Sequence, residues 1–176
     1  HLGGPIAIYK FAPQSACQNL KVNFSAQTTV NTMVEWDFGD GHTSKSKTPS
    51  YQYDKQGIYF PKILLRDSGG CTTVIVPKDS ILIWPVPKAA FSITSNCLDD
   101  SIHFKNLSLS NIKTNPHYQT NWLIDTAKTD TKDATWKFQK RAIYGAQLTV
   151  KNQFGCEDTT NKKIVITKPD AGFNLK

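Results

Sequence analysis

The second half of this chain repeats landmarks of the first half at matching distances. Aromatic residues and cysteines recur 80 residues apart early in each half and 85 residues apart late in it, as Phe11 and Phe91, Cys17 and Cys97, Phe24 and Phe104, Tyr59 and Tyr144, and Cys71 and Cys156. Self-similarity at a fixed period indicates tandem copies of one structural unit. We therefore predict two domains, at residues 1–84 and 85–167, and the start of a third copy at residues 168–176.

The apolar residues of both copies follow a β-strand pattern. Short alternating runs, such as Leu20–Phe24, Met33–Phe38 and Tyr118–Ile124, are separated by clusters of turn-forming residues, and no long stretch has the period of a helix. Strands at this spacing are typical of an all-β sandwich. We therefore predict an all-β fold with two tandem β-sandwiches.

The four cysteines fall into one pair per copy. Their matching positions favour one disulfide within each copy, Cys17 with Cys71 and Cys97 with Cys156, although four cysteines allow three connectivities. A domain of about 80 residues buries only a little over 60% of its extended surface, so an additional staple is expected. Closing a loop of about 55 residues stabilises a fold by roughly 4 kcal/mol in the chain-entropy model. Matched pairs are typical of an oxidising compartment, and four buried free thiols are the alternative.

Charge and motif content exclude several classes of function. The net charge is +7, but no basic block is long enough for a nucleic-acid-binding arm. No apolar run approaches the roughly 18 residues that span a membrane, which predicts no membrane insertion by this segment. The four histidines lack zinc-ligand spacing, and the sequence has no nucleophile elbow, phosphate-binding loop or dinucleotide fingerprint. We predict a protein that is not an enzyme, carries no cofactor and has no nucleic acid among its partners.

Carboxylates in turns are the candidates for a metal site. Calcium takes oxygen ligands from loops. The candidate ligands are Asp37 and Asp40 in the first copy and Asp99, Asp100, Asp125 and Asp130 in the second. Their spacing matches no calcium-binding loop, and the two copies do not share the set. Aspartate is common in turns because its carboxylate bonds to local backbone, so solvated turn residues are the preferred interpretation.

Two tryptophans and a basic group are candidates for contact with a glycan. The strand pattern gives no reason to bury Trp84 or Trp136, and an exposed tryptophan can stack on a sugar ring. Basic residues around the second of these could meet an acidic polysaccharide. They are Lys128, Lys132, Lys137, Lys140 and Arg141. Interspersed Asp130 and Asp133 weaken this field, so solvated loop charges are the favoured alternative.

One run in the first copy carries a family resemblance. Residues 36–41 read Trp-Asp-Phe-Gly-Asp-Gly, and Tyr53, Gly57 and Tyr59 follow. This order resembles the PKD domain, an immunoglobulin-like β-sandwich of polycystins and of many bacterial surface and secreted proteins. The resemblance implies a sandwich of this type in both copies. The residues to which it gives a structural role are Trp36, Asp37, Phe38, Gly39, Asp40, Gly41, Tyr53, Gly57, Tyr59, Trp122 and Tyr144.

The motif residues predict a buried strand followed by a tight turn. Alternation places Trp36 and Phe38 in the core, and Asp40-Gly41 is a strong hairpin signal because glycine accepts positive φ. Tyr59 resembles the corner tyrosine of immunoglobulin-like folds, which has a buried ring and a bonded hydroxyl. In the second copy, residues 123–126 replace the turn glycines, which predicts a differently shaped loop there.

The resemblance implies a role in spacing and presentation. We predict a non-catalytic spacer and adhesion module of a large, extracellular or cell-surface, multi-repeat protein, such as an adhesin or a gliding-motility filament. The alternative is a carbohydrate-binding accessory module of a secreted hydrolase. Asp-Ser pairs such as Asp79-Ser80, and the acidic residues after Gly-Cys at residues 155–158, resemble features of Bacteroidetes surface proteins. The expected partners are neighbouring repeats of the same chain and a surface polysaccharide or another surface protein.

Overall fold

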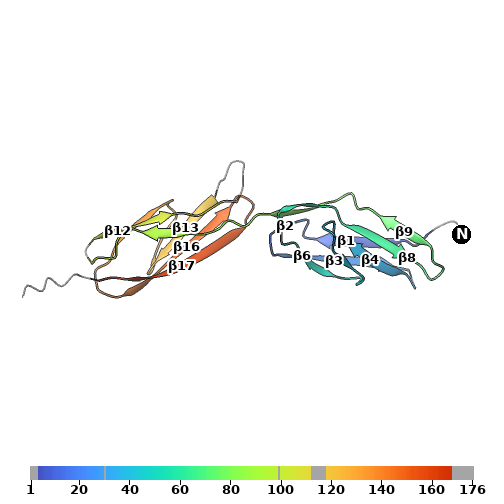
Figure 1. The fold of residues 1–176 in the computed structure, drawn as a ribbon, viewed down its shortest axis with the longest axis horizontal. Coiled ribbons are helices and arrows are strands. Elements are labelled where there is room, and N and C mark those ends of the chain that lie inside the picture. The colour runs from blue at the N-terminus through green and yellow to red at the C-terminus, as the bar shows by residue number, and fades with distance from the viewer. Residues whose placement is uncertain (1–3, 30, 99, 112–117, 168–176) are drawn as a thin grey trace, which may run out of the picture. The chain divides into compact units, whose positions relative to one another are not determined.

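The protein is built from β-strands (Figure 1). The structure, a computed structural model, describes residues 4–29, 31–98, 100–111 and 118–167. All regular secondary structure in this part of the chain is strand, which confirms the all-β prediction. The predicted start of a third copy, at residues 168–176, lies outside the described residues. The described residues include no helix that is long and apolar enough to cross a membrane.

The chain divides into two units, His1–Pro85 and Val86–Lys176. The strands of the first unit are β1 (Ala7–Ala12), β2 (Ser15–Cys17), β3 (Lys21–Thr28), β4 (Met33–Asp37), β5 (Thr43–Ser44), β6 (Ser50–Gln52), β7 (Gly57–Tyr59), β8 (Lys62–Arg66), β9 (Thr72–Ile75) and β10 (Ile81–Trp84). They form sheets of order β1-β3-β6, β2-β10-β7 and β5-β4-β8-β9. Alternate side chains of these strands point inward, so the core lies between the sheets.

An aromatic cluster forms the core of the first unit. Trp36 on β4 is fully buried, and the ring of Phe24 on β3 meets it edge-on at a centroid distance of 5.0 Å. Phe24 also contacts Phe11 on β1 at 5.8 Å and Phe38 at 4.9 Å. Since these rings come from strands of two different sheets, the cluster fastens the two layers to each other.

The second unit also buries a tryptophan between two sheets. Its strands are β11 (Phe91–Ile93), β12 (Ser101–Asn106), β13 (Tyr118–Ile124), β14 (Ala127–Thr129), β15 (Ala134–Lys137), β16 (Ile143–Asn152) and β17 (Glu157–Val165). They form sheets of order β11-β12-β15 and β14-β13-β16-β17. Trp122 on β13 is buried against Phe91 and Phe104, at centroid distances of 5.1 and 5.9 Å. The repeated aromatic landmarks therefore occupy equivalent core positions.

In each unit, a tyrosine hydroxyl forms a hydrogen bond with the backbone at an equivalent position. The hydroxyl of Tyr59 donates to the Lys55 carbonyl at 2.8 Å, and that of Tyr144 donates to the Lys140 carbonyl at 3.1 Å, four residues upstream in each case. Each tyrosine ring also lies over an aromatic ring six residues earlier, at centroid distances of 4.3 and 4.2 Å. Each bond ties a tyrosine in a strand to the loop that precedes that strand, as the bond of a corner tyrosine does.

The cysteines do not pair within the repeats. Cys17 and Cys156 are disulfide-bonded, whereas Cys71 and Cys97 carry free thiols. The prediction of one bridge in each copy, Cys17–Cys71 and Cys97–Cys156, is therefore wrong. Cys156 directly precedes β17, while Cys97 pairs with Thr167 beyond its other end. A strand of this length spans roughly 30 Å, and a disulfide needs Cα atoms within about 7 Å.

A similar separation explains why Cys17 and Cys71 are not bonded to each other in the first unit. Cys17 ends β2, and Cys71 lies in the turn between β8 and β9. These two places are at opposite ends of the sandwich (Figure 1). Equivalent positions in two copies thus identify corresponding cysteines, but they do not identify bonded ones.

Candidate functional site

The motif at residues 36–41 forms the end of β4 and the hairpin into β5. Gly39 and Gly41 both have left-handed backbone conformations, with φ of 84° and 94°, which glycine adopts without steric cost. Gly39 is also confined, because an added Cβ would lie 2.9 Å from the backbone N and O of Phe60. The carboxylate of Asp37 accepts a hydrogen bond from the Gly39 N–H at 2.8 Å. Backbone conformation, space and a side-chain bond therefore all fix this turn.

Asp40 is held by hydrogen bonds from its neighbours. The Tyr51 hydroxyl donates to its Oδ2 at 2.7 Å, and the His42 N–H donates to its Oδ1 at 3.1 Å. Burial of the side chain, which is 19% exposed, raises the pKa of Asp40, but the bonds from Tyr51 and His42 outweigh it and hold the pKa below its ordinary value. Asp40 therefore joins the turn to β6 as a structural carboxylate.

Three tyrosines surround this turn. The ring of Tyr51 stacks on Phe38 at a centroid distance of 4.0 Å, and the Tyr53 hydroxyl donates to the Phe38 carbonyl at 2.9 Å. Burial is the main cause of the raised pKa of Tyr51, Tyr53 and Tyr59, and the negative charge of Asp40 adds to it. The three hydroxyls act as neutral donors, so the cluster is a packing and hydrogen-bonding unit rather than an acid–base site.

Substituting Asp40 is expected to change the acid stability of the first unit. A carboxyl group whose pKa is lower in the folded chain adds stability at pH values above its ordinary value of 3.8, and this stability is lost as the pH falls through the folded pKa. The urea midpoint of the wild type should therefore fall more between pH 6 and pH 3 than that of Asp40→Asn. Asp79→Asn, at an exposed loop position, is the matched control. If the urea midpoints of Asp40→Asn and the wild type fell equally between pH 6 and pH 3, this would contradict the lowered pKa of Asp40.

The second unit replaces the motif turn with a shorter hairpin. Ile124 pairs with Ala127 across a two-residue turn, in which Asp125 has a φ of 55°. Trp122 remains buried, and its indole N–H donates to the Thr131 carbonyl at 3.1 Å. The core position is thus kept while the turn changes shape.

Trp136 is exposed on an edge strand of the second unit. Trp136 on β15 pairs with Ile102 on β12, as Tyr51 on β6 pairs with Val22 on β3. Trp136 is 37% exposed. It lines a hollow of about 410 Å³ whose other lining side chains include Lys128, Thr129, Thr131, Asp133 and Thr135. A hollow therefore stands where the first unit has its Tyr51–Asp40 contact.

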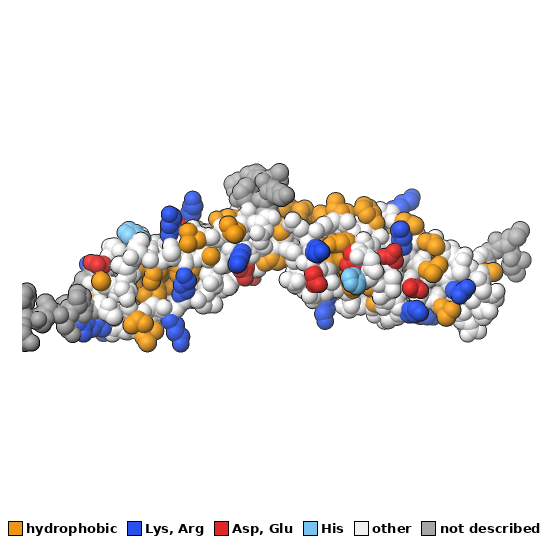
Figure 2. All heavy atoms as spheres, viewed as in Figure 1, with side chains coloured by type: hydrophobic (Ala, Val, Ile, Leu, Met, Phe, Trp, Pro, Cys, Tyr) orange, Lys and Arg blue, Asp and Glu red, His pale blue; other side chains and the backbone are white. Residues whose placement is uncertain are grey.

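The other glycan candidates do not gather around Trp136. Lys137 follows it on the strand and points to the opposite face, and Lys140 and Arg141 are exposed in the loop between β15 and β16. Trp84 is half-buried at the end of β10 in the first unit. On the face shown in Figure 2, Lys and Arg side chains of the second unit are scattered rather than grouped. Among the residues predicted to contact a glycan, only Lys128 lines the hollow together with Trp136.

The turn carboxylates do not converge on one point. Across the described parts of the chain, no group of three His, Cys, Asp or Glu side chains is placed to hold a metal ion. Asp37 and Asp40 use oxygen atoms in the turn bonds described above. Asp99 lies outside the described residues.

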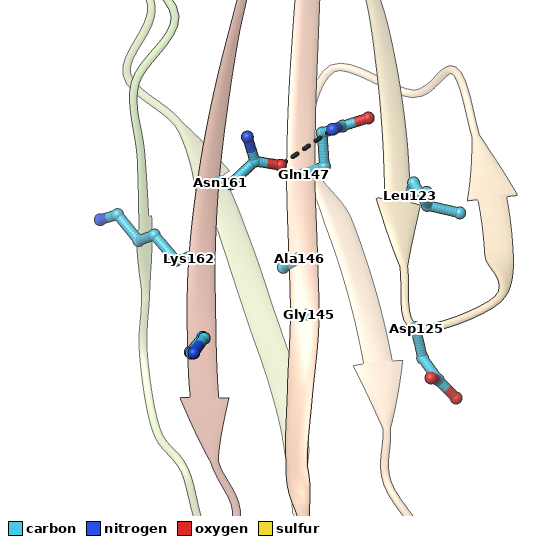
Figure 3. A pocket seen from close by; sticks show the side chains of 8 residues that line it. Leu123, Asp125, Gly145, Ala146, Gln147, Asn161 and Lys162 are labelled. Atoms are coloured by element: carbon cyan, nitrogen blue, oxygen red, sulfur yellow. Dashed lines mark hydrogen bonds between the residues drawn. The ribbon is translucent and has the colours of Figure 1, made fainter.

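Sequence reasoning missed the outward face of the sheet β14-β13-β16-β17. We call the outer face the side chains of Gln119, Asn121 and Leu123 on β13, Ile143, Gly145, Gln147, Thr149 and Lys151 on β16, and Glu157, Thr159, Asn161, Lys163 and Val165 on β17. A hollow of about 370 Å³ lies over Gly145 (Figure 3). The signals that could have revealed it are the alternating polar residues and a glycine inside a strand-like run.

The sequence comparisons concern the first unit. Residues 4–81 match the PKD domain family, and the match includes the whole motif at residues 36–41. A microbial collagenase of Vibrio alginolyticus is 36% identical over 56 residues, which are 29% of this chain and 7% of the collagenase. This chain therefore matches only a small part of that relative's length. The first unit matches the family that its motif resembles.

Similar solved structures include two PKD1 domains. That of the Vibrio cholerae metalloprotease PrtV has 22% identity and a TM-score of 0.41, and covers 47% of this chain and 99% of its own. That of Vibrio anguillarum Epp has 20% identity and a TM-score of 0.42, with coverages of 48% and 96%. A structure of carbohydrate-binding modules from the β-sandwich superfamily has 14% identity and a TM-score of 0.42, with coverages of 98% and 88%.

Proposed function

We propose that this chain is a non-catalytic spacer and adhesion module of a secreted or cell-surface protein. The observation that carries the proposal is the motif turn, where Asp37, Asp40 and Tyr51 direct their polar atoms to bonds within the first unit. The match of residues 4–81 to the PKD domain family supports it. A relative named as a collagenase supports an extracellular setting, since collagen is an extracellular protein.

The second unit is, on this proposal, a divergent repeat of the same type. The equivalent aromatic clusters around Trp36 and Trp122 support this, as do the matching bonds of Tyr59 and Tyr144. Neighbouring repeats of the same chain would then be its first partners. The resemblance of Asp79-Ser80 and of residues 155–158 to features of Bacteroidetes surface proteins favours an adhesin or a gliding-motility protein as the setting.

A carbohydrate-binding accessory module is the second candidate function. The observation that favours it is the exposure of Trp136 beside a hollow that also presents hydroxyl and charged groups. A partly exposed indole offers a flat apolar surface for the face of a sugar ring. This candidate differs from a spacer because it requires a ligand in the second unit.

One experiment tests both candidates. The whole chain is incubated with neutral and acidic polysaccharides and with gelatin, and released reducing ends and peptides are measured. We expect no release; product formation that changes with a point substitution in this chain would refute the non-catalytic role. Native gels containing the same polysaccharides measure binding. If the hollow takes a sugar, Trp136→Ala weakens binding by about tenfold or more, and Phe60→Ala, at an aromatic side chain that is 55% exposed in the first unit, does not.

A further inference from the structure

The outer face of the second unit contains a glycine that the fold does not require. Gly145 lies inside β16, paired with Lys163 of β17. Its φ is outside the left-handed region, and a Cβ added to it would meet nothing within 4 Å. Neither backbone conformation nor packing therefore calls for glycine here, although glycine inside a strand costs about 0.5–1 kcal/mol. A glycine in a strand interior often marks a bulge, a tight bend, or a site where a ligand or another backbone approaches closely, and the last of these fits the hollow above Gly145.

The hollow over Gly145 is bordered by two fixed amides. The Gln147 Nε2 donates to the Asn161 Oδ1 at 2.8 Å across the β16–β17 pair. Figure 3 shows these side chains meeting beside the bare stretch of strand at Gly145. Their bond orients both groups, and among the described residues the Gln147 Oε1 and the Asn161 Nδ2 have no other partner. The pair therefore presents an oriented acceptor beside oriented donors.

Opposite charges lie on the two sides of Gly145. The Asp125 N–H donates to the Gly145 carbonyl at 2.8 Å, which places the Asp125 carboxylate at one border of the hollow, and Lys163 lines the other. Lys162, although it also lines the hollow, directs its ammonium to the Phe91 carbonyl and ring. The two charges that remain balance each other, so the hollow offers both an anionic acceptor and a cationic donor with little net charge.

The hollow continues along the sheet. A second hollow of about 550 Å³ shares Leu123 and Gln147 with the first, and its lining adds Asn121 and Thr149. The Trp136 hollow shares Lys128 and Thr129 with this second one. A row of hollows thus crosses the second unit from Gly145 to Trp136, and such a row suits an extended ligand better than a compact one.

The chemistry of the outer face fits a hydroxyl-rich ligand. Most of its side chains are hydrogen-bond donors or acceptors, and its apolar side chains are Leu123 and, at one end, the exposed cross-strand pair Ile143 and Val165. A protein-binding patch is instead centred on aromatic, methionine or arginine anchors. Neighbouring hydroxyls of a sugar ring present a donor and an acceptor side by side, which matches the Gln147–Asn161 pair, while the apolar face of the ring can lie on Leu123.

We propose that the outer face, centred on the hollow at Gly145, binds a neutral polysaccharide through Gln147, Asn161, Asp125 and Lys163. This site lies at the opposite end of the row of hollows from the predicted contact at Trp136. It would supply the adhesion role proposed above with a ligand, and to that extent it rests on that role. Glycine at residue 145 keeps the hollow open so that a sugar ring can approach the backbone of β16.

The test uses the whole chain in native gels that contain laminarin, xyloglucan, arabinoxylan, galactomannan or dextran, with heparin as a polyanion. We expect at least one neutral polysaccharide to retard the wild type, and its affinity is then measured by titration calorimetry. Gly145→Val should weaken binding by about tenfold or more without lowering the melting temperature, because valine favours the strand and has room for its side chain. Gln147→Ala should weaken binding by about fivefold, the loss of one hydrogen bond.

Matched variants separate this site from its alternatives. Ser101→Val adds the same bulk at an exposed strand position on the other sheet of the second unit and should bind as the wild type does. Unchanged binding by Gly145→Val, binding lost through Trp136→Ala alone, retardation by heparin alone, or no retardation by any neutral polysaccharide would each overturn the proposal. These outcomes concern binding only, so each of them would leave the non-catalytic role intact. Release of a product from a polysaccharide or from gelatin would instead refute the non-catalytic role, and it would not show where the polysaccharide binds.

Discussion

Trp36→Ala is expected to unfold the first unit under conditions in which the wild type is folded. Trp36 is fully buried and packs edge-on against Phe24. Truncating a buried tryptophan costs about 3–5 kcal/mol, while a unit of this size has a total stability of roughly 4–12 kcal/mol. The two cores share no residue. An amide NMR spectrum should therefore lose the dispersed signals of residues 4–81 and keep those of the second unit.

Phenylalanine variants separate the packing of the ring from its hydrogen bond. The indole N–H of Trp36 is buried without a hydrogen-bond partner among the described residues, whereas that of Trp122 donates to the Thr131 carbonyl. Trp36→Phe keeps most of the apolar contact and removes an unsatisfied donor. Trp122→Phe also gives up a hydrogen bond, which is worth about 1 kcal/mol. Trp36→Phe should therefore shift the urea midpoint of its unit by less than Trp122→Phe shifts its own.

Two observations would contradict this account of the cores. The first is a Trp36→Ala spectrum in which residues 4–81 remain dispersed, since this would show that the indole does not organise the first unit. The second is a Trp36→Phe variant that is more destabilised than Trp122→Phe, since this would show that the Trp36 N–H has a stabilising partner.

The features that sequence reasoning predicted well are governed by neighbours in the chain. The hairpin after Trp36 follows from glycines whose conformation is fixed within a few residues, and both have positive φ in the structure. The bonds of Tyr59 and Tyr144 each reach a carbonyl four residues away. Burial of Trp36 and Trp122 follows from alternation along a single strand. None of these predictions needs to know which strands are neighbours in the sheet.

The disulfide prediction failed because it required long-range geometry. The match in spacing makes Cys71 the counterpart of Cys156, but spacing does not say at which end of a sandwich a residue lies. The length of β17 alone separates Cys97 from Cys156. Symmetry between repeats is evidence of equivalent positions, and pairing has to be taken from the arrangement of the strands.

The hollow at Gly145 was missed for a related reason. The strand-like run at residues 144–150 places Gly145 inside a strand, but it does not show which strands lie on either side. The register of β16 with its neighbours shows that Gly145 is an interior strand residue facing outward between β13 and β17. The oriented amides of Gln147 and Asn161 likewise depend on the β16–β17 register, because 14 residues separate them in the chain. A face assembled from three strands is not readable from any one of them.

Gly39→Ala is expected to be the most damaging single-methyl substitution in the motif turn. It combines two costs. An L-residue with the left-handed conformation of Gly39 loses roughly 1–2 kcal/mol, and the new methyl group would lie 2.9 Å from the backbone N and O of Phe60. Backbone atoms cannot move aside as a flexible side chain can, so the overlap should cost a further 1–3 kcal/mol or so. The total of about 3 kcal/mol is measured as the urea-unfolding free energy of the first unit.

Gly41→Ala is the matched control, because it carries the cost of a left-handed conformation without the steric overlap. Gly41 has a similar φ of 94°, yet a Cβ there would meet nothing within 4 Å. It should therefore show only the conformational cost of roughly 1–2 kcal/mol. Equal losses in the two variants would mean that the loop at Phe60 moves away without resistance, and that conformation alone explains the glycine at residue 39. A larger loss in Gly39→Ala, with the second unit unaffected, would show that the motif turn is held against Phe60 and that its first glycine is required for close packing.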